Sequence, residues 1–247
     1  MNVSTAPFKN KTLLLFDVDG TLVQSADRAD SRCFAAAYEH LYAKPFPSID
    51  WHAYPHVTDT TILQTVIRQH FGRAASSQEI QHFEEDYIER LKQKRFQKPT
   101  DFFEIPGANA LINRLLKEKE FLPVIATGGW IRPAHVKLQH IGIPSDQMIA
   151  CGADGKTTRE AIIQETLDLA YRHCDEFYKI VYIGDAAWDV AATRRLGMDF
   201  VGIRSDKDLD TLAALGATQV LPHFLDQEGF LEAVMRARPP IPEKTDF

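Results

Sequence analysis

The chain has 247 residues, of which 45% are hydrophobic and 25% are charged, and this composition argues against a collagen-like, coiled-coil or disordered protein. It has 28 Lys and Arg against 34 Asp and Glu, and the formal net charge of −6 disfavours nucleic acid as the main partner. Three cysteines without a CxxC spacing indicate neither a disulfide framework nor a zinc site, so we expect a cytoplasmic protein. The longest apolar run near the start, residues 13–16, is too short for a signal peptide or a bilayer span, and we expect no membrane partner.

The length leaves room for two structural units, since a domain typically takes roughly 150 residues. Residues 1–10 and 238–247 contain proline and polar residues without apolar periodicity, so we expect both to be tails. We predict that residues 11–23 and 104–237 form a core domain and that residues 24–103 form an inserted domain.

Short apolar runs predict the strands of one sheet. Their hydrophobic residues are largely continuous rather than alternating, which is typical of strands covered by helices on both faces. The clearest runs lie at 12–20, 121–129 and 178–185, and weaker ones lie at 147–152 and 198–204. Helical patterns alternate with these runs, at 110–120, 134–142 and 186–197. This alternation predicts an α/β fold with a doubly wound parallel sheet.

The segment 24–103 interrupts the alternation, because it has helical periodicity throughout and no strand-like run. Its helical patterns lie at 29–42, 59–71 and 77–96. The insertion begins just past the first predicted strand, at the edge where open α/β sheets bind ligands. We therefore predict an all-helical cap that lies over the functional site.

Two carboxylates follow the first predicted strand, in the sequence Asp17-Val18-Asp19-Gly20-Thr21. Ionised carboxylates beside a buried sheet edge must be paired, hydrated or bound to a cation, so the pair suggests a hard metal ion with oxygen ligands. Asp17 is also a candidate nucleophile, and Asp19 a candidate proton donor and acceptor. For an isolated DxDG sequence, an Asx turn that closes the strand is the simpler interpretation.

Polar residues also follow two other predicted strands. Thr127 and Gly128 offer a hydroxyl and backbone amides that suit the oxygens of an anion, although a plain turn is the simpler explanation of a lone TGG. Asp185 and Asp189 are four residues apart on one helix face, so both carboxylates can point back toward the sheet edge. Taken alone, Asp185 is equally well explained as a helix cap.

A phosphate at this edge would need a basic residue, because the Asp17 carboxylate and a phosphoryl oxygen repel each other. Lys156 and Arg159 are the candidates. Arg159 opens a predicted helix whose N-terminal amides also favour an anion. Each cation, taken singly, is also compatible with a solvated position on a loop.

In combination, these segments resemble the haloacid dehalogenase-like (HAD) hydrolase superfamily, and the resemblance covers the chain apart from its tails. The family's first motif, hhhDxDGT, matches LLLFDVDGTL at 13–22, and its fourth, GDxxxD, matches GDAAWD at 184–189. Its second motif, a strand that ends in Thr or Ser, matches PVIATGG at 123–129. The insertion point resembles that of the helical cap in phosphoglycolate phosphatase-like and β-phosphoglucomutase-like members. The resemblance implies a Rossmann-type core and a cap that closes over small substrates.

The resemblance implies that Asp17 attacks phosphorus to give an aspartyl-phosphate, and that Asp19 protonates the leaving alkoxide and later activates water. It implies that Thr127 binds the phosphoryl oxygens. Mg²⁺ would be held by the carboxylates of Asp17 and Asp185 and the backbone carbonyl of Asp19. Asp189 would support the site from beside it. A carboxylate at position 19 favours phosphate ester cleavage over dehalogenation, because halide release needs no proton.

The third motif departs from the family pattern KPxP(D/E). It aligns with Lys156-Thr157-Thr158-Arg159-Glu160, so the Lys and the acid are kept and both prolines are lost. Lys156 holds the family's position, whereas some relatives place an Arg at this helix start. We therefore favour Lys156 and retain Arg159 as the second catalytic candidate.

Two further residues are candidates for substrate binding. Gly128 lies beside Thr127, and His56 stands where many relatives have Gly. His56, with Thr58 and Asp59, could contact the part of the substrate that carries no phosphate. A surface loop in which Thr58 caps a helix is the simpler interpretation, and it is the one we expect.

We therefore predict a Mg²⁺-dependent phosphatase that acts on a small phosphorylated metabolite through an aspartyl-phosphate. A phosphomutase would keep the same core and shield the intermediate from water, and a non-catalytic ligand-binding module would keep only the fold. The presence of Asp19 argues against the binding module, because binding alone needs no protonatable group there. The sequence is compatible with a monomer or a homodimer.

Overall fold

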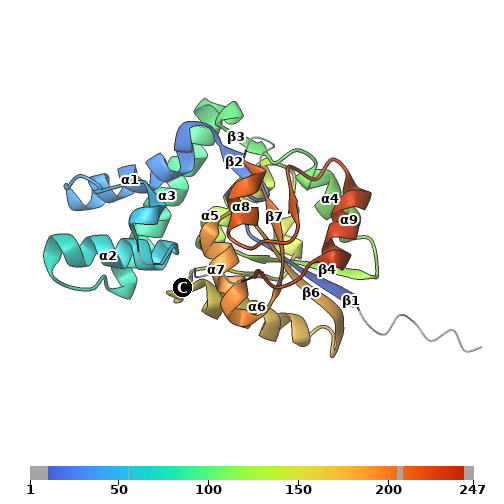
Figure 1. Cartoon of the computed structure of the whole chain (residues 1–247). Coiled ribbons are helices and arrows are strands. Elements are labelled where there is room, and N and C mark those ends of the chain that lie inside the picture. Colours follow the sequence, from blue (N-terminus) through green and yellow to red (C-terminus); the bar gives the residue numbers. More distant parts are fainter. Residues whose placement is uncertain (1–10, 55, 205–207, 242–247) are drawn as a thin grey trace, which may run out of the picture.

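The computed structural model describes residues 11–54, 56–204 and 208–241. The tail expected at 1–10, and residues 242–247 of the other expected tail, lie outside these described residues. The core is a six-stranded parallel sheet with the strand order β5-β4-β1-β6-β7-β8 (Figure 1). The strands are β1 Lys11–Phe16, β4 Phe121–Ala126, β5 Ala150–Cys151, β6 Phe177–Gly184, β7 Asp199–Ile203 and β8 Val220–Leu221. The predicted parallel α/β sheet is confirmed, with β8 as an additional short edge strand.

Strand β1 lies inside the sheet, between β4 and β6. Its residue Leu14 pairs with Val181 of β6. Leu13 and Leu15 pack on one face of the sheet, Leu14 and Phe16 pack on the other, and all four are fully buried. Burial on both faces explains why the run is continuously apolar. It also places the residue that follows β1 at the middle of the sheet's C-terminal edge.

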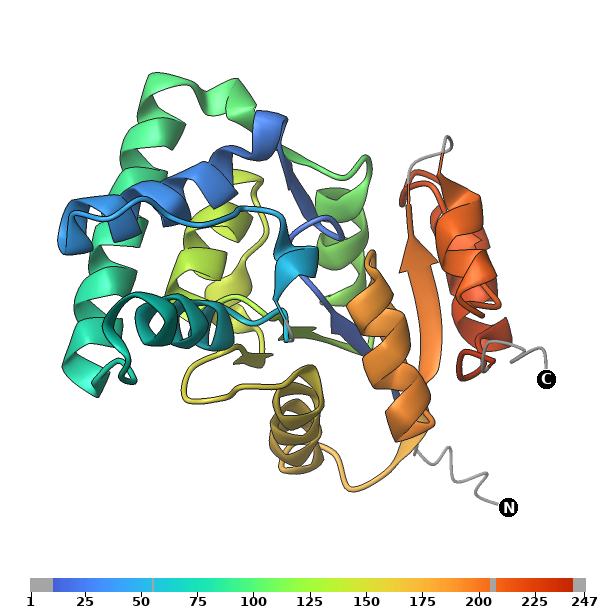
Figure 2. The same ribbon diagram turned by 60° about the vertical axis from the view of Figure 1, so that its left-hand side comes forward.

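Helices cover both faces of the sheet (Figure 2). The helices on one face are α4 Ala108–Leu115, α5 Ile131–His140 and α9 Gln227–Arg236. The helices on the other face are α6 Arg159–Tyr171, α7 Ala187–Leu196 and α8 Leu209–Ala214. This arrangement is the doubly wound core that the alternation of patterns predicts.

The insertion consists of helices that lie together beside the core, on the left of Figure 1. They are α1 Ala29–Tyr42, α2 Asp59–Phe71 and α3 Ser77–Gln97. The Thr58 side chain accepts the N–H of Thr61, so Thr58 caps α2 as expected. Ser76 and Glu79 form a capping box at the start of α3. Short 3₁₀ helices lie at Ala26–Arg28, Trp51–Ala53, Pro99–Asp101 and Ser145–Gln147.

Two short strands join the insertion to the core. β2 Val23–Ser25 and β3 Phe102–Glu104 pair antiparallel, with Val23 opposite Glu104. The expectation that residues 24–103 contain no strand was therefore wrong, because strands of three residues are too short to show a periodicity. The pair brings the two ends of the insertion together next to the turn that follows β1.

The described part of the expected C-terminal tail lies against the core. The N–H of Phe200 in β7 donates to the carbonyl of Arg238 at 3.3 Å, and the N–H of Ile241 donates to the carbonyl of Gly216 at 2.9 Å. Residues 238–241 are thus hydrogen-bonded to β7 and to the end of α8.

An aromatic contact joins the cap to the core. Trp130, which follows β4, is 2% exposed and stacks on Phe34 of α1, with ring centroids 6.0 Å apart. It also packs edge-on against Phe83 of α3. Its Nε1 donates to Oγ1 of Thr60 in α2 at 2.9 Å. The cap therefore packs directly on the loop after β4.

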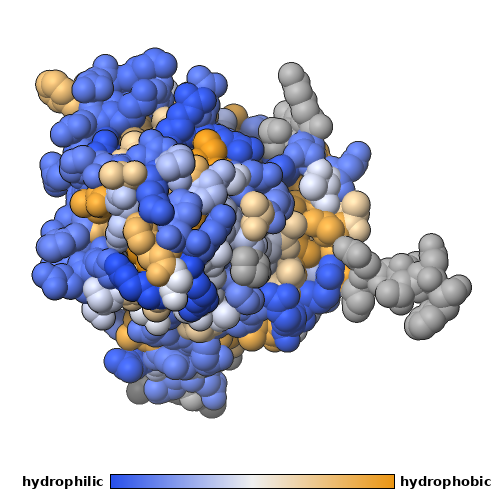
Figure 3. All heavy atoms as spheres, turned by 90° about the vertical axis from the view of Figure 1, so that its left-hand side faces the viewer, coloured by the Kyte–Doolittle hydropathy of each residue, from blue (hydrophilic) through white to orange (hydrophobic). Residues whose placement is uncertain are grey.

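The outer face of the cap is mostly polar. Figure 3 views the molecule from this side, where hydrophilic residues dominate and hydrophobic ones appear in small groups. Within the described ranges, every helix is too short or too polar to cross a bilayer.

Candidate active site

A cavity of about 310 Å³ lies between the cap and the ends of β1, β4 and β6. Its core side is lined by Asp17, Asp19, Thr127, Gly128, Lys137, Arg159 and Asp185. Its cap side is lined by Asp30, Phe34, Trp51, Asp59 and Tyr87. The C-terminal edge of a parallel sheet, covered by a second unit, is the usual position of a ligand site in such folds.

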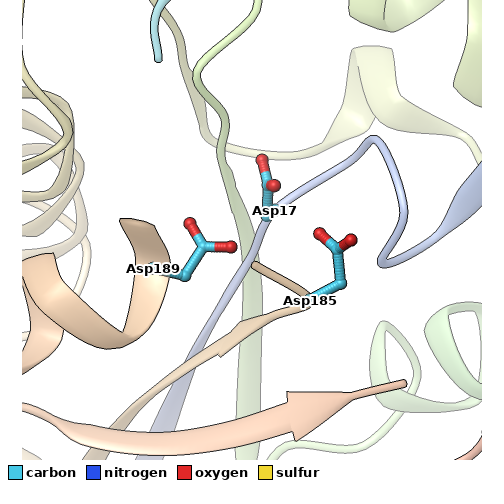
Figure 4. Close-up of side chains that lie close together, drawn as sticks. All are labelled: Asp17, Asp185 and Asp189. Carbon is cyan, nitrogen blue, oxygen red and sulfur yellow. The ribbon is translucent and has the colours of Figure 1, made fainter. Parts of the chain in front are cut away.

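Three carboxylates converge at the base of this cavity (Figure 4): Asp17 and Asp185 line it, and the fully buried Asp189 lies next to them. Asp17 directly follows β1, Asp185 directly follows β6, and Asp189 lies on the first turn of α7. One carboxylate oxygen from each residue lies within 4.8 Å of the other two. These three acids, together with Arg159 beside them, are called the floor of the cavity below.

Two glycines make room for the carboxylates. Gly20 has a φ of +82°, and a Cβ there would lie 2.1 Å from Oδ2 of Asp185. A Cβ on Gly184 would lie 2.7 Å from Oδ2 of Asp189. The glycines of DxDG and GDxxxD therefore stand where a side chain would displace an acid.

Negative charge is in excess on the floor. Burial, followed by repulsion from Asp189 and Asp17, raises the pKa of Asp185 well above its usual value. Burial raises the pKa of Asp189 to about 7, although Arg159 opposes the shift. Oδ1 of Asp17 is buried and accepts no hydrogen bond within the part of the chain that is described. Clustered carboxylate oxygens of this kind fit a hard divalent cation such as Mg²⁺.

Arg159, the first residue of α6, is the buried cation of the floor, and Arg204 lies at the edge of the floor with its Nη1 3.6 Å from Oδ2 of Asp185. Its Nη1 lies 3.0 Å from Oδ1 of Asp189 and 3.1 Å from Oδ1 of Asp17, the latter an ionic contact that is not aligned as a hydrogen bond. Nη1 also donates to the hydroxyl of Tyr182, and Nε donates to the carbonyl of Val57 in the cap at 3.3 Å. Burial would lower the pKa of Arg159, but Asp17 and Asp189 raise it well above its usual value, so the guanidinium stays charged.

Three candidates from the sequence do not line this cavity, namely Lys156, His56 and Asp189, the last of which is fully buried beside it. Nζ of Lys156 donates to the carbonyl of Asp154 at 3.0 Å and pairs with Glu165. Lys156 precedes the N-cap of α6, whereas Arg159 begins the helix and reaches back over the sheet edge. His56 is exposed and lines a separate hollow on the outside. The structure thus brings Arg159 to Asp17, and not Lys156, the cation favoured from the sequence, because Lys156 lies before the N-cap and pairs with Glu165.

The loop after β4 supplies the expected hydroxyl and amides. Thr127 is 1% exposed, and its Oγ1 accepts the N–H of Gly129 at 3.2 Å. Gly128 lies so close to the Arg159 guanidinium that a Cβ would be 2.6 Å from Nη2. The carbonyl of Gly128 accepts the N–H of Asp59 in the cap at 2.9 Å. The loop is therefore held between the floor and the cap.

Asp19 points to a different partner from the three floor acids. Both of its carboxylate oxygens are hydrogen-bonded to Nζ of Lys137 on α5. Burial raises the pKa of Asp19 to about 6, although the charge of Lys137 opposes the shift. A pKa near neutrality suits a group that must both give and take a proton.

Two residues of the site, Lys137 and Tyr182, were not predicted from the sequence. Lys137 is 5% exposed and shares the inner face of α5 with Pro133, Ala134 and Leu138. The sequence could have indicated Lys137, because a charged residue stands there on the apolar face of a predicted helix. Tyr182, fully buried in β6, gives no comparable signal, because an aromatic residue in a buried strand is ordinary.

The family model described as haloacid dehalogenase-like hydrolase matches residues 14–203, which is most of the chain. The match begins in β1 and ends at the last residue of β7, so it includes the cap and every strand end that lines the cavity. The chain therefore belongs to the haloacid dehalogenase-like hydrolases. The predicted family and the hydrolase class are confirmed.

Solved structures share the architecture. A hydrolase from Pseudomonas syringae is 19% identical, with a TM-score of 0.64 over 91% of this chain and 99% of that chain. CbbY from Rhodobacter sphaeroides, solved in complex with phosphate, is 16% identical, with a TM-score of 0.61 over 87% and 95% of the two chains. An archaeal β-phosphoglucomutase from Pyrococcus sp. strain ST 04 is 15% identical, with a TM-score of 0.50 over 91% and 99%. Identities this low establish a common fold. No curated protein matches the sequence significantly.

Proposed function

We propose that the chain is a Mg²⁺-dependent phosphatase that cleaves small phosphate monoesters through an aspartyl-phosphate on Asp17. The observation that carries this proposal is the convergence of three carboxylates within 4.8 Å, beside Arg159, of which Asp17 and Asp185 line the cavity under the cap. On this floor Asp17 can act as the nucleophile, and Arg159 can offset the negative charge of a phosphoryl group. Asp19 lines the same cavity and can act as the proton donor.

The reaction has two steps. A carboxylate oxygen of Asp17 attacks phosphorus while the bond to the ester oxygen breaks, and Asp19 gives its proton to the leaving alkoxide. In the second step the ionised Asp19 takes a proton from a water molecule that attacks phosphorus. The acyl-phosphate bond then breaks, which releases inorganic phosphate and restores the Asp17 carboxylate. Thr127 would donate to a phosphoryl oxygen, and Arg159 would offset the charge of the phosphoryl group.

Mg²⁺ would be held by the carboxylates of Asp17 and Asp185 and by the backbone carbonyl of Asp19. Two observations support this assignment. Oδ1 of Asp17 accepts no hydrogen bond among the described residues, and burial together with the neighbouring carboxylates raises the pKa of Asp185 in spite of the nearby arginines. When bound, the ion offsets the repulsion between carboxylate and phosphate. Asp189 accepts the N–H of Ala186 at 3.1 Å and pairs with Arg159, so it would keep the guanidinium in place.

The cavity limits the size of the substrate. A volume of about 310 Å³ suits a small phosphorylated metabolite and leaves no room for a folded macromolecule. The cytoplasmic location and the monomeric or homodimeric state stay predictions from the sequence.

The test is phosphate release from a panel of phosphorylated sugars, alcohols and carboxylic acids, with Mg²⁺ and with a chelator. We expect at least one compound to release inorganic phosphate about 100-fold faster with the ion than without it. The proposal would be contradicted if the protein with Mg²⁺ released phosphate from none of these compounds.

A phosphomutase is the second candidate, and the shared fold with the Pyrococcus β-phosphoglucomutase favours it. Phosphorus NMR of the products separates the two activities, because a mutase moves the phosphate to another hydroxyl and releases little of it. A non-catalytic binding module would bind phosphate esters and leave them unchanged.

A further inference from the structure

The pair formed by Asp19 and Lys137 stands apart from the motifs that define the floor. Lys137 is 5% exposed, and its Nζ is hydrogen-bonded to both oxygens of the Asp19 carboxylate. Across the described ranges, Lys137 is the only residue that hydrogen-bonds to this carboxylate. Burying an ammonium group destabilises a fold unless its partner is well placed, so the pair requires an explanation.

The structure fixes Asp19 at two points. Its backbone lies in the turn after β1, where it forms an isolated β-bridge with Val23. Its carboxylate is held by Lys137. Helix α5, which carries Lys137, is itself anchored, because Arg95 of α3 donates to the carbonyl of Val136 at 3.0 Å. Holding a side chain at both ends selects one rotamer.

The carboxylate borders a small space that a glycine leaves open. A Cβ on Gly129 would lie 3.8 Å from Oδ2 of Asp19, 3.7 Å from Oγ1 of Thr127 and 3.5 Å from Oδ2 of Asp59. The acid therefore lies across this space from the hydroxyl that the proposed function assigns to the phosphoryl group. A leaving-group oxygen bonded to that phosphoryl group would be within reach of Asp19.

The two buried cations of the cavity have separate partners. Arg159 contacts Asp17 and Asp189 on the floor, whereas Lys137 hydrogen-bonds only to Asp19 in the described part of the chain. This separation argues against Lys137 as a second ligand of the phosphoryl group.

We propose that Lys137 is a positioning residue that holds the Asp19 carboxylate toward the leaving-group oxygen of the substrate. This inference rests on the proposed function, because it assigns Lys137 a part in the phosphatase reaction. Without Lys137 the Asp19 carboxylate is free to rotate away from the leaving-group oxygen, so proton transfer becomes slower. The arrangement of the floor residues stays unchanged.

The first test uses Lys137→Met, which keeps the length of the side chain and removes its charge. With an alkyl phosphate we expect kcat to fall about 100-fold, and KM to change less than about threefold. With p-nitrophenyl phosphate, whose leaving group needs little protonation, the loss should stay below about tenfold. Lys137→Arg restores a donor and should recover at least about tenfold of the alkyl rate. The matched control is Lys179→Met, which removes a similarly buried lysine that pairs with Asp199 outside the cavity and should leave both rates unchanged.

A double-mutant cycle separates positioning from direct binding. Because Lys137 is argued to act through Asp19, Lys137→Met should cost less than about threefold when it is added to Asp19→Asn. The positioning role would be overturned if the double variant lost the product of the two single losses in kcat, or if Lys137→Met lowered kcat equally for alkyl and aryl esters. If the losses multiplied and KM also rose, Lys137 would instead be identified as a ligand of the phosphate.

A crystal structure of the Lys137→Met protein gives a readout that does not depend on activity. We expect the Asp19 carboxylate to have left its original direction, and an unmoved carboxylate overturns the inference. Lys137→Gln replaces Lys137→Met in all these measurements if the Met variant does not fold. Failure of the proposed function has a different signature, namely a wild-type protein that hydrolyses no ester or an Asp17→Asn protein that stays active.

Discussion

The floor of the cavity and the Asp19–Lys137 pair contain the same kinds of charge in different proportions. The floor gathers three carboxylates around Arg159, and Arg204 lies 3.6 Å from Asp185, so carboxylates outnumber cations. Asp19 and Lys137 match one carboxylate to one ammonium group. A floor with excess negative charge attracts a divalent cation, whereas a balanced pair does not need one.

This difference in charge balance explains how one cavity can support both phosphoryl transfer and proton transfer. The floor is suited to binding and accepting a phosphoryl group, because Asp17 offers the attacking oxygen while the surrounding charges offset the charge of the phosphoryl group. The pair is suited to proton transfer, because its carboxylate keeps its place while the proton comes and goes. Substitutions on the floor should therefore affect all phosphate esters alike, and substitutions in the pair should depend on the leaving group.

Asp17→Asn should have the largest effect. Removal of the nucleophile is expected to lower phosphate release from every ester, p-nitrophenyl phosphate included, by at least about 10⁴-fold. The measurement is initial phosphate release with Mg²⁺, with circular dichroism as the check of folding. Asp146→Asn, at an exposed position, is the control and should remain active. Substantial turnover by Asp17→Asn would exclude this acid as the nucleophile.

Asp19→Asn should discriminate between leaving groups. We expect kcat for an alkyl phosphate to fall about 1,000-fold and kcat for p-nitrophenyl phosphate to fall about tenfold, because only the alkoxide needs a strong proton donor. The ratio of the two losses in the same preparation is the measurement, so misfolded protein cannot produce it. A ratio near one would remove the acid role and the distinction between the two regions.

Arg159→Ala and Lys156→Ala form a matched pair of cation deletions. Arg159→Ala should lower kcat/KM about 100-fold for alkyl and aryl esters alike, because Arg159 lies 3.1 Å from Asp17 on the floor. Lys156→Ala should change it less than about twofold, because Lys156 pairs with Glu165 outside the cavity. The reverse order of effects would reinstate Lys156 as the motif cation and contradict the geometry of the floor.

Among the substitutions expected to impair the protein, Thr60→Val should have the smallest effect. It removes a contact that holds the cap against the loop after β4. Oγ1 of Thr60 donates to the carbonyl of Ala153 and accepts Nε1 of Trp130, so the substitution leaves a buried indole N–H without a partner. We expect a loss of about 1–2 kcal/mol in the free energy of unfolding and a rise of about threefold in KM. Thr166→Val, which removes a buried hydroxyl bonded within α6, is the control for stability alone. Equal KM values for the two variants would show that this contact does not hold the cap.

The floor could be predicted from the sequence because its acids follow buried strands directly. Asp17 and Asp185 end continuous apolar runs, and parallel strands bring their C-terminal ends to one edge of the sheet. The three cap helices were predictable for a similar local reason, because their apolar residues repeat with the helical period. The short strands β2 and β3 were missed, since three residues carry no period.

The choice between Lys156 and Arg159 could not be made from the sequence. The two residues lie on either side of the N-cap of α6, and the direction in which each points depends on how that helix meets the sheet. The partner of Asp19 was equally inaccessible, because Lys137 lies on a different helix and far away along the chain. A pairing of this kind is set by packing and leaves no spacing to recognise.

The amino-acid sequence by itself determined the family, the alternation of the longer strands and helices, and the acids at the strand ends, because each depends on local periodicity or on motifs of a few residues. Only the tertiary structure decided which cation meets Asp17, that Asp19 is bound by a buried lysine, and how the cap packs on the loop after β4. The physical reason is that a charge in a closed cavity takes its partner from whichever element packs against it, and that choice is made by the folded chain as a whole.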